Sequence, residues 1–489
     1  MKIKTMTVIM IIFIAFSACG QNDNNDAVEL ESRILTILIR DNWHIGVIEQ
    51  AVIAMNESWQ AQGLPYIFEV EVDTSDFGDT NWIESRMGRL GVELMAGQGS
   101  DMFISGFSND IRSVVRSGLL ADMYTLMDNC PNTNRDDFFT NVLSAFEIDG
   151  GLYTFPLSFG FHYVGINTAL PQVFIERFNQ ESTVTIRQML GIYLDVKEQQ
   201  EFAHLFLGTP TSINSRYTMI ENTMHNFIDF NSRTSNIMDD DFISYLDLIS
   251  RVFRRNENLP RDGTSSSPFI PSNVLRNLQD RRIFFTDSSM LSPVHAFLGD
   301  GEYFAWYSPL ADESGRLFID NSMLSNSVWA SFSITSAGQQ ELAWEFIQHL
   351  IKAYSQPTES ASVDPIWGTP LQIGSFSFST PIKRSLADEH LRRVFENILE
   401  INDLFVERDV EAGFANFITP QEQAKQIEAA ISRINAYNEM PMATLSPQLP
   451  WSLFVGSHGT NVSNFMSGAI TAETYAQLTH NAVSLWLIE

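Results

Sequence analysis

Apolar positions in the first hundred residues change their spacing several times along the chain. The run Ile34–Arg40 is almost continuously apolar, as expected of a buried strand. The next apolar positions recur at the spacing of one helix face, namely Ile48, Ala51, Val52, Met55 and Trp59. Tyr66–Val72 reads as a second strand, residues 82–95 as a second helix and Asp101–Ser105 as a third strand. Alternating strands and helices predict a parallel sheet covered by helices.

Two short segments follow the first and third predicted strands. Ligands of such sheets bind beyond the carboxyl ends of the strands. That rule points to Asp41 and Trp43 after the first strand, and to Phe107 and Asp110 after the third. The carboxylates are candidate acceptors for ligand hydroxyl groups. Asp41 could equally be the N-cap of the following helix.

The pattern after residue 167 is rich in helices. Thr185 and Gln188 have the spacing of a capping box that opens a helix at Ile186–Val196. Asp239–Arg255 carries an apolar stripe at helical spacing. Val328–Ile334 alternates as a strand, and Ser336–Tyr354 follows as an amphipathic helix. This return to strand and helix predicts that the chain rejoins its first sheet.

Three prolines mark places where strands end. Leu152–Phe155 is prone to form a strand, and Pro156 prevents it from continuing as an interior strand. The aromatic stretch that follows either crosses between two lobes or forms a hairpin inside one domain. Pro309 and Pro381 end similar stretches, so we place two further crossings there.

Length, charge and composition limit the possible functions. A chain of 489 residues is too long for one compact core, and its 44% apolar and 18% charged residues are typical of a globular protein. The formal net charge of −29 disfavours nucleic acids and anionic lipid surfaces as partners. Two lobes of ordinary size are therefore expected.

The N-terminus has the features of an exported lipoprotein. Lys2 and Lys4 precede the apolar run Val8–Phe16, which is too short to span a bilayer comfortably. Phe16-Ser17-Ala18-Cys19 resembles a lipobox, and a polar linker follows. A conventional secretory signal is the alternative, but it does not account for Cys19. With Cys19 acylated, the second cysteine, Cys130, has no partner for a disulfide.

The segment around Pro156 resembles the DG-x-x-Y-x-x-P…N crossing of extracellular solute-binding proteins, the capture components of bacterial ABC importers. The matching residues are Asp149, Gly150, Tyr153, Pro156 and Asn167. Gly151 departs from the polar residue that is usual there. Five other segments resemble the family in the same order, at residues 93–106, 118–122, 282–290, 341–347 and 468–489. The resemblance therefore covers nearly the whole chain after the tether.

The resemblance implies an α/β fold of two lobes, each with a mixed, mainly parallel sheet flanked by helices, joined by three hinge crossings. The expected division is a signal peptide at 1–18, a lipidated tether at 19–32, lobe 1 at 33–155 and 311–380, and lobe 2 at 156–310 and 381–489. The implied function is capture of a mono- or oligosaccharide between the lobes and its delivery to an ABC permease. We expect a monomer, anchored by lipid on the extracellular face of the membrane, with no nucleic-acid partner.

Aromatic residues at predicted strand ends and crossings are the candidate ligand-binding groups, because sugars stack on rings while hydroxyl groups meet carboxylates and amides. Besides Trp43 and Phe107 they are Phe159, Phe161, Tyr163, Trp306, Trp329 and Trp367. Packing in a core is the alternative for each ring. Trp344, inside a helix, is expected in a core. Ser289 is placed at the ligand by the resemblance alone.

No enzymatic motif appears, and we expect no catalytic residue, metal site or cofactor. The sequence has no H-E-x-x-H helix and no G-x-S-x-G elbow. Three alternatives stay open. The same fold could sense a ligand for a membrane receptor, or it could bind a solute other than a sugar. A secreted glycan-active enzyme is the third, since its two acids need no local spacing.

Overall fold

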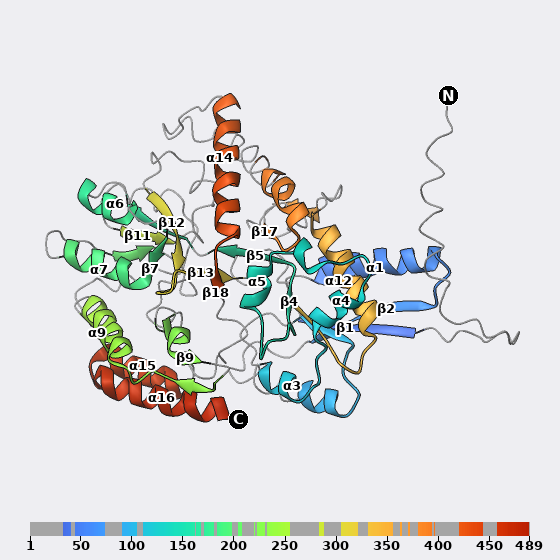
Figure 1. Cartoon of the computed structure of the whole chain (residues 1–489), viewed down its shortest axis with the longest axis horizontal. Coiled ribbons are helices and arrows are strands. Elements are labelled where there is room, and N and C mark those ends of the chain that lie inside the picture. The colour runs from blue at the N-terminus through green and yellow to red at the C-terminus, as the bar shows by residue number, and fades with distance from the viewer. Residues whose placement is uncertain are drawn as a thin grey trace, which may run out of the picture.

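The chain forms two mixed sheets with helices packed around them (Figure 1). The computed structural model describes residues 33–40, 45–73, 90–104, 111–161, 163–167, 171–179, 183–197, 204–207, 220, 223–229, 232–254, 283–287, 305–320, 331–355, 362–363, 370–371, 380–393, 396, 420–443 and 457–488. In Figure 1 the first sheet lies on the right and most of the second on the left. We call the two halves the first and second lobe.

The first sheet has five strands in the order β2-β1-β3-β14-β4. They are β1 (Arg33–Arg40), β2 (Tyr66–Asp73), β3 (Met102–Ile104), β14 (Ser331–Ile334) and β4 (Phe155–Pro156). β1 pairs in parallel with both β2 and β3, and β14 runs antiparallel between β3 and β4. The predicted alternation of strands and helices is confirmed where it is described, as is the return of the chain to this sheet. Of the helix predicted at 82–95, residues 90–95 are helical and the rest lie outside the described residues.

Helices cover the first sheet and complete its core. They are α1 (Ile45–Ala61), α3 (Arg112–Arg116), α4 (Met123–Asn129), α5 (Thr140–Ala145) and α12 (Gln340–Ser355). The five α1 positions predicted to share one face are all buried, with Trp59 fully enclosed. Trp344 of α12 is buried against Phe155, which confirms the expectation that it belongs to the core. The short 3-10 turn Arg135–Asp137 links α4 to α5.

The second sheet has nine strands, seven of them in the order β17-β5-β13-β12-β6-β11-β8. Their bounds are β17 (Thr380–Pro381), β5 (Ser158–Phe161), β13 (Leu317–Asp320), β12 (Ala305–Ala311), β6 (Tyr163–Asn167), β11 (Ile283–Asp287) and β8 (His204–Leu207), with β7 (Val184–Thr185) on β12 and β18 (Met442–Ala443) on β13. Five of its eight described pairings are antiparallel. The expectation of a mainly parallel sheet is wrong here, because consecutive segments such as β12 and β13 form hairpins.

The second core is formed mainly by helices after β6. They are α6 (Gln172–Asn179), α7 (Ile186–Lys197), α9 (Asp240–Arg254), α15 (Ser457–Ser467) and α16 (Ala472–Ile488). The predicted capping box is confirmed: the amide of Thr185 donates to the Gln188 side chain, and the amide of Gln188 donates to the Thr185 hydroxyl. Small elements complete the described residues: a 3-10 turn at His225–Phe227 and the strand pairs β9 (Ile228–Asp229) with β10 (Thr234–Ser235) and β15 (Ser362–Val363) with β16 (Pro370–Leu371).

The chain passes from the first sheet to the second at residue 157. β4 pairs with β14 in the first sheet, whereas β5 pairs with β13 and β17 in the second. The proline at position 156 ends β4, as the sequence indicated. This arrangement favours the interlobe crossing over a hairpin within one domain.

The second crossing lies elsewhere than predicted. Pro309 sits inside β12, where its partner on β6 is Tyr163. The next residue, Leu310, already pairs with β7. The proline therefore marks a change of strand partner, and the chain leaves the second sheet only between β13 and β14. Residues 311–320 belong to the second sheet, which corrects their expected place in lobe 1.

The third crossing ends at β17, whose Thr380 and Pro381 pair with β5. After it, a helix at residues 384–393 and α14 (Pro420–Asn438) pack into the same apolar cluster as the first sheet, through Ala387, Leu391 and Ile431. The same cluster also contains residues of β5 and β13 in the second sheet, and Tyr437 of α14 contacts Phe161 of β5. The cluster therefore does not assign these helices to one lobe, and their place in lobe 2 stays a prediction. Among the described residues at the end of the chain, those of α15 and α16 bury their apolar faces in the second core.

Candidate functional site

The first lobe brings two strand ends together at one edge of its sheet. β1 and β3 are parallel neighbours, with Ile37 opposite Met102 and Leu38 opposite Phe103. Their carboxyl ends, Arg40 and Ile104, therefore lie side by side. The candidate residues that follow these ends, Asp41, Trp43, Phe107 and Asp110, lie outside the described residues.

The second lobe brings the start of β6 and the end of β11 together beside the middle of β12. In the register of β6 with its two neighbours, Val164 lies opposite both Asp287 of β11 and Ser308 of β12. Tyr163, a candidate ligand residue, is thus at the end of β6 where β11 finishes. Trp306 lies opposite Ile166, about 10 Å further along the strand at 3.4 Å a residue. Ser289, two residues beyond β11, lies outside the described residues.

Two candidate rings belong to the core. Phe159 is 0% exposed and Phe161 is 7% exposed. Phe159 contacts the rings of Phe139 and Phe161 edge to face, and Phe161 contacts Tyr437 of α14. The expectation that these rings line the ligand site is corrected for this structure, because β5 is covered by helices on the side where both rings lie. Trp329 and Trp367 lie outside the described residues.

The crossing strands form a compact, hydrogen-bonded group. The amide of Ile382, just after β17, donates to the carbonyl of Leu157 between β4 and β5 over 2.9 Å. Small polar residues are buried nearby: the Ser333 hydroxyl donates to the carbonyl of Tyr153 and lies 3.3 Å from the Thr154 hydroxyl. Two of the three crossings therefore run together, as required of strands about which two lobes turn.

Two aspartates of the family-like segments support the backbone of the first lobe. One Asp101 carboxylate oxygen accepts from the amide and the hydroxyl of Thr36, and the other accepts from the amide of Gln339. Asp122 caps α4 and also accepts from the amide of Leu152, just before the crossing. Both residues hold strands and helix ends in place: these contacts use both carboxylate oxygens of Asp101 and one of Asp122.

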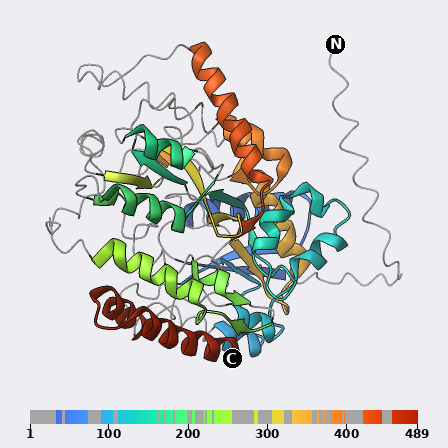
Figure 2. The ribbon, with the colours of Figure 1, turned by 60° about the vertical axis from the view of Figure 1, so that its left-hand side comes forward.

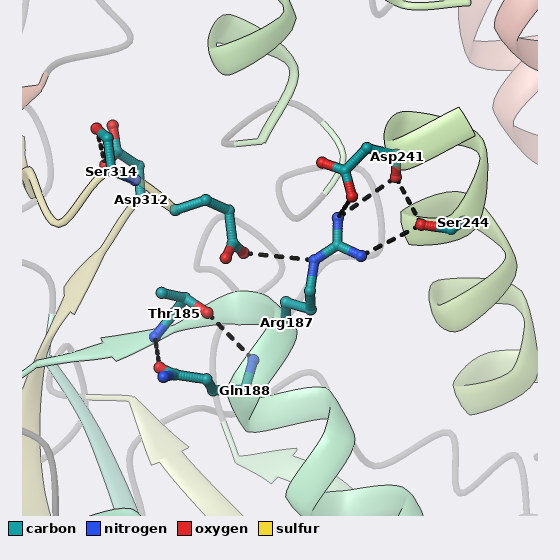
Figure 3. Close-up of polar contacts among 8 residues, drawn as sticks. Thr185, Arg187, Gln188, Asp241, Ser244, Asp312 and Ser314 are labelled. Atoms are coloured by element: carbon teal, nitrogen blue, oxygen red, sulfur yellow. Dashed lines mark hydrogen bonds and ion pairs between the residues drawn. The ribbon is translucent and has the colours of Figure 1, made fainter. Parts of the chain in front are cut away.

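The second lobe contains an ion network around Arg187 of α7 (Figure 3). Its guanidinium donates to the Asp241 carboxylate over 3.0 Å and lies 3.7 Å from the Glu313 carboxylate. Burial raises the pKa of the Glu313 carboxyl, although Arg187 acts in the opposite direction. The same guanidinium lies 5.5 Å from the ring centroid of the buried Tyr245, whose hydroxyl pKa is also raised by burial. This network joins α7, α9 and the β12–β13 turn.

One residue that sequence reasoning missed connects the two lobes. Arg112 begins α3 and is nearly fully buried, and its guanidinium carbon lies 5.7 Å from the ring centroid of Trp486 on α16. The sequence contains one signal for this residue. Arg112 is a charged residue between the apolar Ile111 and Val114, two positions after the candidate Asp110.

The described residues hold no group of three or more His, Cys, Asp or Glu side chains arranged to bind a metal ion. Among the same residues, no helix has the length and apolar character needed to cross a membrane.

No protein-family model matches the chain, and no curated protein does. Solved structures do match. The sugar-binding protein MalE from Xanthomonas citri aligns with a TM-score of 0.56 at 12% identity, over 93% of this chain and 98% of that one. An extracellular solute-binding protein family 1 from Alicyclobacillus acidocaldarius aligns with a TM-score of 0.51 at 12% identity, over 94% and 99%. A sugar transporter from Arthrobacter chlorophenolicus with bound laminaribiose aligns with a TM-score of 0.50 at 11% identity, over 93% and 99%.

These alignments show a shared fold along nearly the full length of each chain. The resemblance read from the sequence is thus confirmed at the level of the fold, a mixed α/β architecture that matches two-lobed solute-binding proteins. The matched structures named here are described as binding or transport proteins.

Proposed function

We propose that this chain is a lipid-anchored extracellular solute-binding protein that captures a saccharide between its lobes and delivers it to an ABC permease. The observation that carries the proposal is the two-sheet fold with its crossings, shared over 93% of the chain with structures described as a sugar-binding protein and as a sugar transporter holding a disaccharide. Ligand that bridges both lobes favours the closed arrangement, which a permease then recognises.

A neutral saccharide suits the candidate residues better than an anion. Six of the candidate residues are aromatic and have side chains that the structure does not describe. They are Trp43, Phe107, Tyr163, Trp306, Trp329 and Trp367. Rings bind the apolar faces of sugars, whereas Asp41 and Asp110 accept hydrogen bonds from hydroxyl groups and would repel a phosphate. The net charge of −29 also disfavours an acidic ligand. We propose no catalytic role.

A thermal-shift screen across neutral mono- and oligosaccharides tests the function. A sugar that binds only the folded chain raises its melting temperature by mass action. Calorimetry on Trp43→Ala and Trp329→Ala then tests the site. Each should bind the sugar more weakly by about 2–4 kcal/mol, the cost of removing an aromatic anchor, and should melt as the native chain does. If both bind normally but melt much lower, the rings belong to a core and the proposed site is misplaced.

The anchor requires a separate experiment. Cys19→Ser should leave the chain in the aqueous phase of a detergent partition, whereas the native chain should enter the detergent phase. Recovery of the native chain wholly in the aqueous phase would contradict lipidation and leave the saccharide proposal standing. A screen that finds no saccharide but finds another solute would redirect the ligand class and keep the binding role.

A further inference from the structure

A side-chain contact connects the start of α3 in the first lobe with the end of α16 in the second. α3 belongs to a small apolar cluster with Phe103 and Leu38, on the first sheet. Trp486 packs against the second core next to Val483 and Leu487. The guanidinium carbon of Arg112 lies 5.7 Å from the Trp486 ring centroid, within the range of a cation–π interaction.

The contact lies away from the crossings. Figures 1 and 2 both show α3 and the C-terminal end of α16 close together at the lower edge of the molecule, whereas β5 and β17 lie higher. When two lobes turn about their crossings, surfaces far from the turning axis separate most. A contact at this position must therefore break or rearrange when the lobes open.

Burial makes this contact selective for one arrangement of the lobes. Arg112 is only 2% exposed, and a charged group that is withdrawn from water needs favourable partners to offset its lost hydration. A tryptophan ring is the aromatic surface that attracts a cation most strongly, and its attraction grows when water is excluded. Rotation of α16 away from α3 would remove this ring from the guanidinium.

We propose that Arg112 and Trp486 form a clasp that holds the two lobes together on the side away from the crossings and sets how readily they open. Asp110, a candidate ligand residue, lies two residues before Arg112 in the chain. The clasp therefore ties the edge of the proposed ligand site to the last helix. This last connection rests on the proposed function, but the clasp itself acts on the lobes whether or not ligand is bound.

Pulsed electron–electron double resonance, which measures the distance between two spin labels, tests the clasp on the full chain without ligand. The labels are carried by p-acetylphenylalanine at the exposed positions Ser117 on the α3 side and Gln477 on α16, so that the native cysteines stay untouched. Trp486→Leu and Arg112→Met should each raise the ratio of long to short distances about fivefold. This change in population is expected on loss of a cation–π contact whose energy lies at the lower end of the range of allosteric coupling energies. The double variant should open no further than either single one.

Two comparisons separate the clasp from simple packing. Trp486→Phe keeps an aromatic face and should lie between the native chain and Trp486→Leu. Arg135→Met removes an arginine 4.2 Å from the Tyr124 ring, inside the first lobe, and should leave the distances unchanged. Identical distance distributions for the native chain, Trp486→Leu and Arg112→Met would overturn the clasp, and so would additive opening in the double variant. Because no ligand is present, either result leaves the saccharide proposal standing.

Discussion

An aspartate in each lobe organises the backbone around it, but the two aspartates accept from different kinds of donor. In the first lobe, Asp101 accepts hydrogen bonds from the amide and hydroxyl of Thr36 in β1 and from the amide of Gln339, just before α12. In the second, the Asp312 side chain is 0% exposed and accepts from two amides, the Ser314 hydroxyl and the Arg316 guanidinium. Arg187 adds a second ion network nearby (Figure 3).

This difference shows which of these sites should respond to salt. Hydrogen bonds from neutral donors are little affected by ionic strength, whereas ion pairs near the surface weaken as salt screens them. Asp101 lies just before β3, at the edge of the sheet opposite the strand ends that lead to the candidate ligand residues. The contacts of Asp101 thus lie at the edge of the sheet opposite the proposed binding site.

The largest expected effect tests whether each lobe has its own core. Phe332→Ala in β14 and Phe242→Ala in α9 each remove a fully buried ring, at a cost of about 3–5 kcal/mol. Phe332 packs in the first apolar cluster and Phe242 in the second. In calorimetry, each variant should therefore lower the melting temperature of a different part of the unfolding transition. Identical traces for the two variants would mean that the lobes unfold as one unit.

Asp312→Asn should have the next largest effect. The amide keeps one oxygen but loses the charge that pairs with Arg316 and presents an NH2 group to donors, so the free energy of unfolding should fall by about 2–4 kcal/mol. Asp195→Asn is the matched control, because the Arg177–Asp195 pair is exposed and such pairs contribute about 0–1 kcal/mol. Equal losses in urea unfolding of the two variants would contradict the role given to the buried carboxylate.

Salt should distinguish the Arg187 network from the Asp101 site. Arg187→Met should cost about 0.5–1 kcal/mol at low ionic strength, and the loss should shrink in 1 M NaCl, where charges are screened beyond about 3 Å. Asp101→Asn should cost about 1–3 kcal/mol at either salt concentration, because its three donors are neutral. Urea unfolding at both concentrations measures this, and a salt-dependent loss for Asp101→Asn would break the contrast.

The smallest effect concerns Glu313. Burial raises its pKa in the folded chain, so the folded state holds the proton more tightly than the unfolded state does. Its contribution to stability is therefore most favourable below the ordinary value of 4.5 and is lost as the pH rises from there through the folded pKa. Glu313→Gln should remove this slope in a plot of melting temperature against pH. A slope that stays unchanged in the variant would show that another group causes it.

Local elements could be predicted because short-range spacing determines them. The buried face of α1 follows from apolar residues at helical spacing, and the Thr185–Gln188 capping box follows from two residues three apart. The prediction that a strand ends at Pro156 is confirmed, because β4 ends there. The same prediction is wrong for Pro309, since a proline looks the same in sequence whether a strand ends or changes its partner.

Long-range packing could not be derived from the sequence in the same way. The amphipathic pattern of α14 shows that one face is buried but does not show which core receives it, and its Ile431 packs in the first cluster. Phe159 and Phe161 have the aromatic character of a sugar site, yet ring contacts with Phe139 and Tyr437 enclose them. Which core or neighbour receives a side chain depends on segments far away in the chain.

Closure of the lobes around a saccharide is the central claim, and small-angle X-ray scattering of the purified chain tests it most directly. The measurement uses a sugar that the thermal-shift screen and calorimetry have shown to bind, at saturating concentration, with a non-binding sugar as the control. The account predicts a smaller radius of gyration with the bound sugar and no change with the control. An unchanged scattering curve with a sugar proven to bind would contradict closure about the crossing strands.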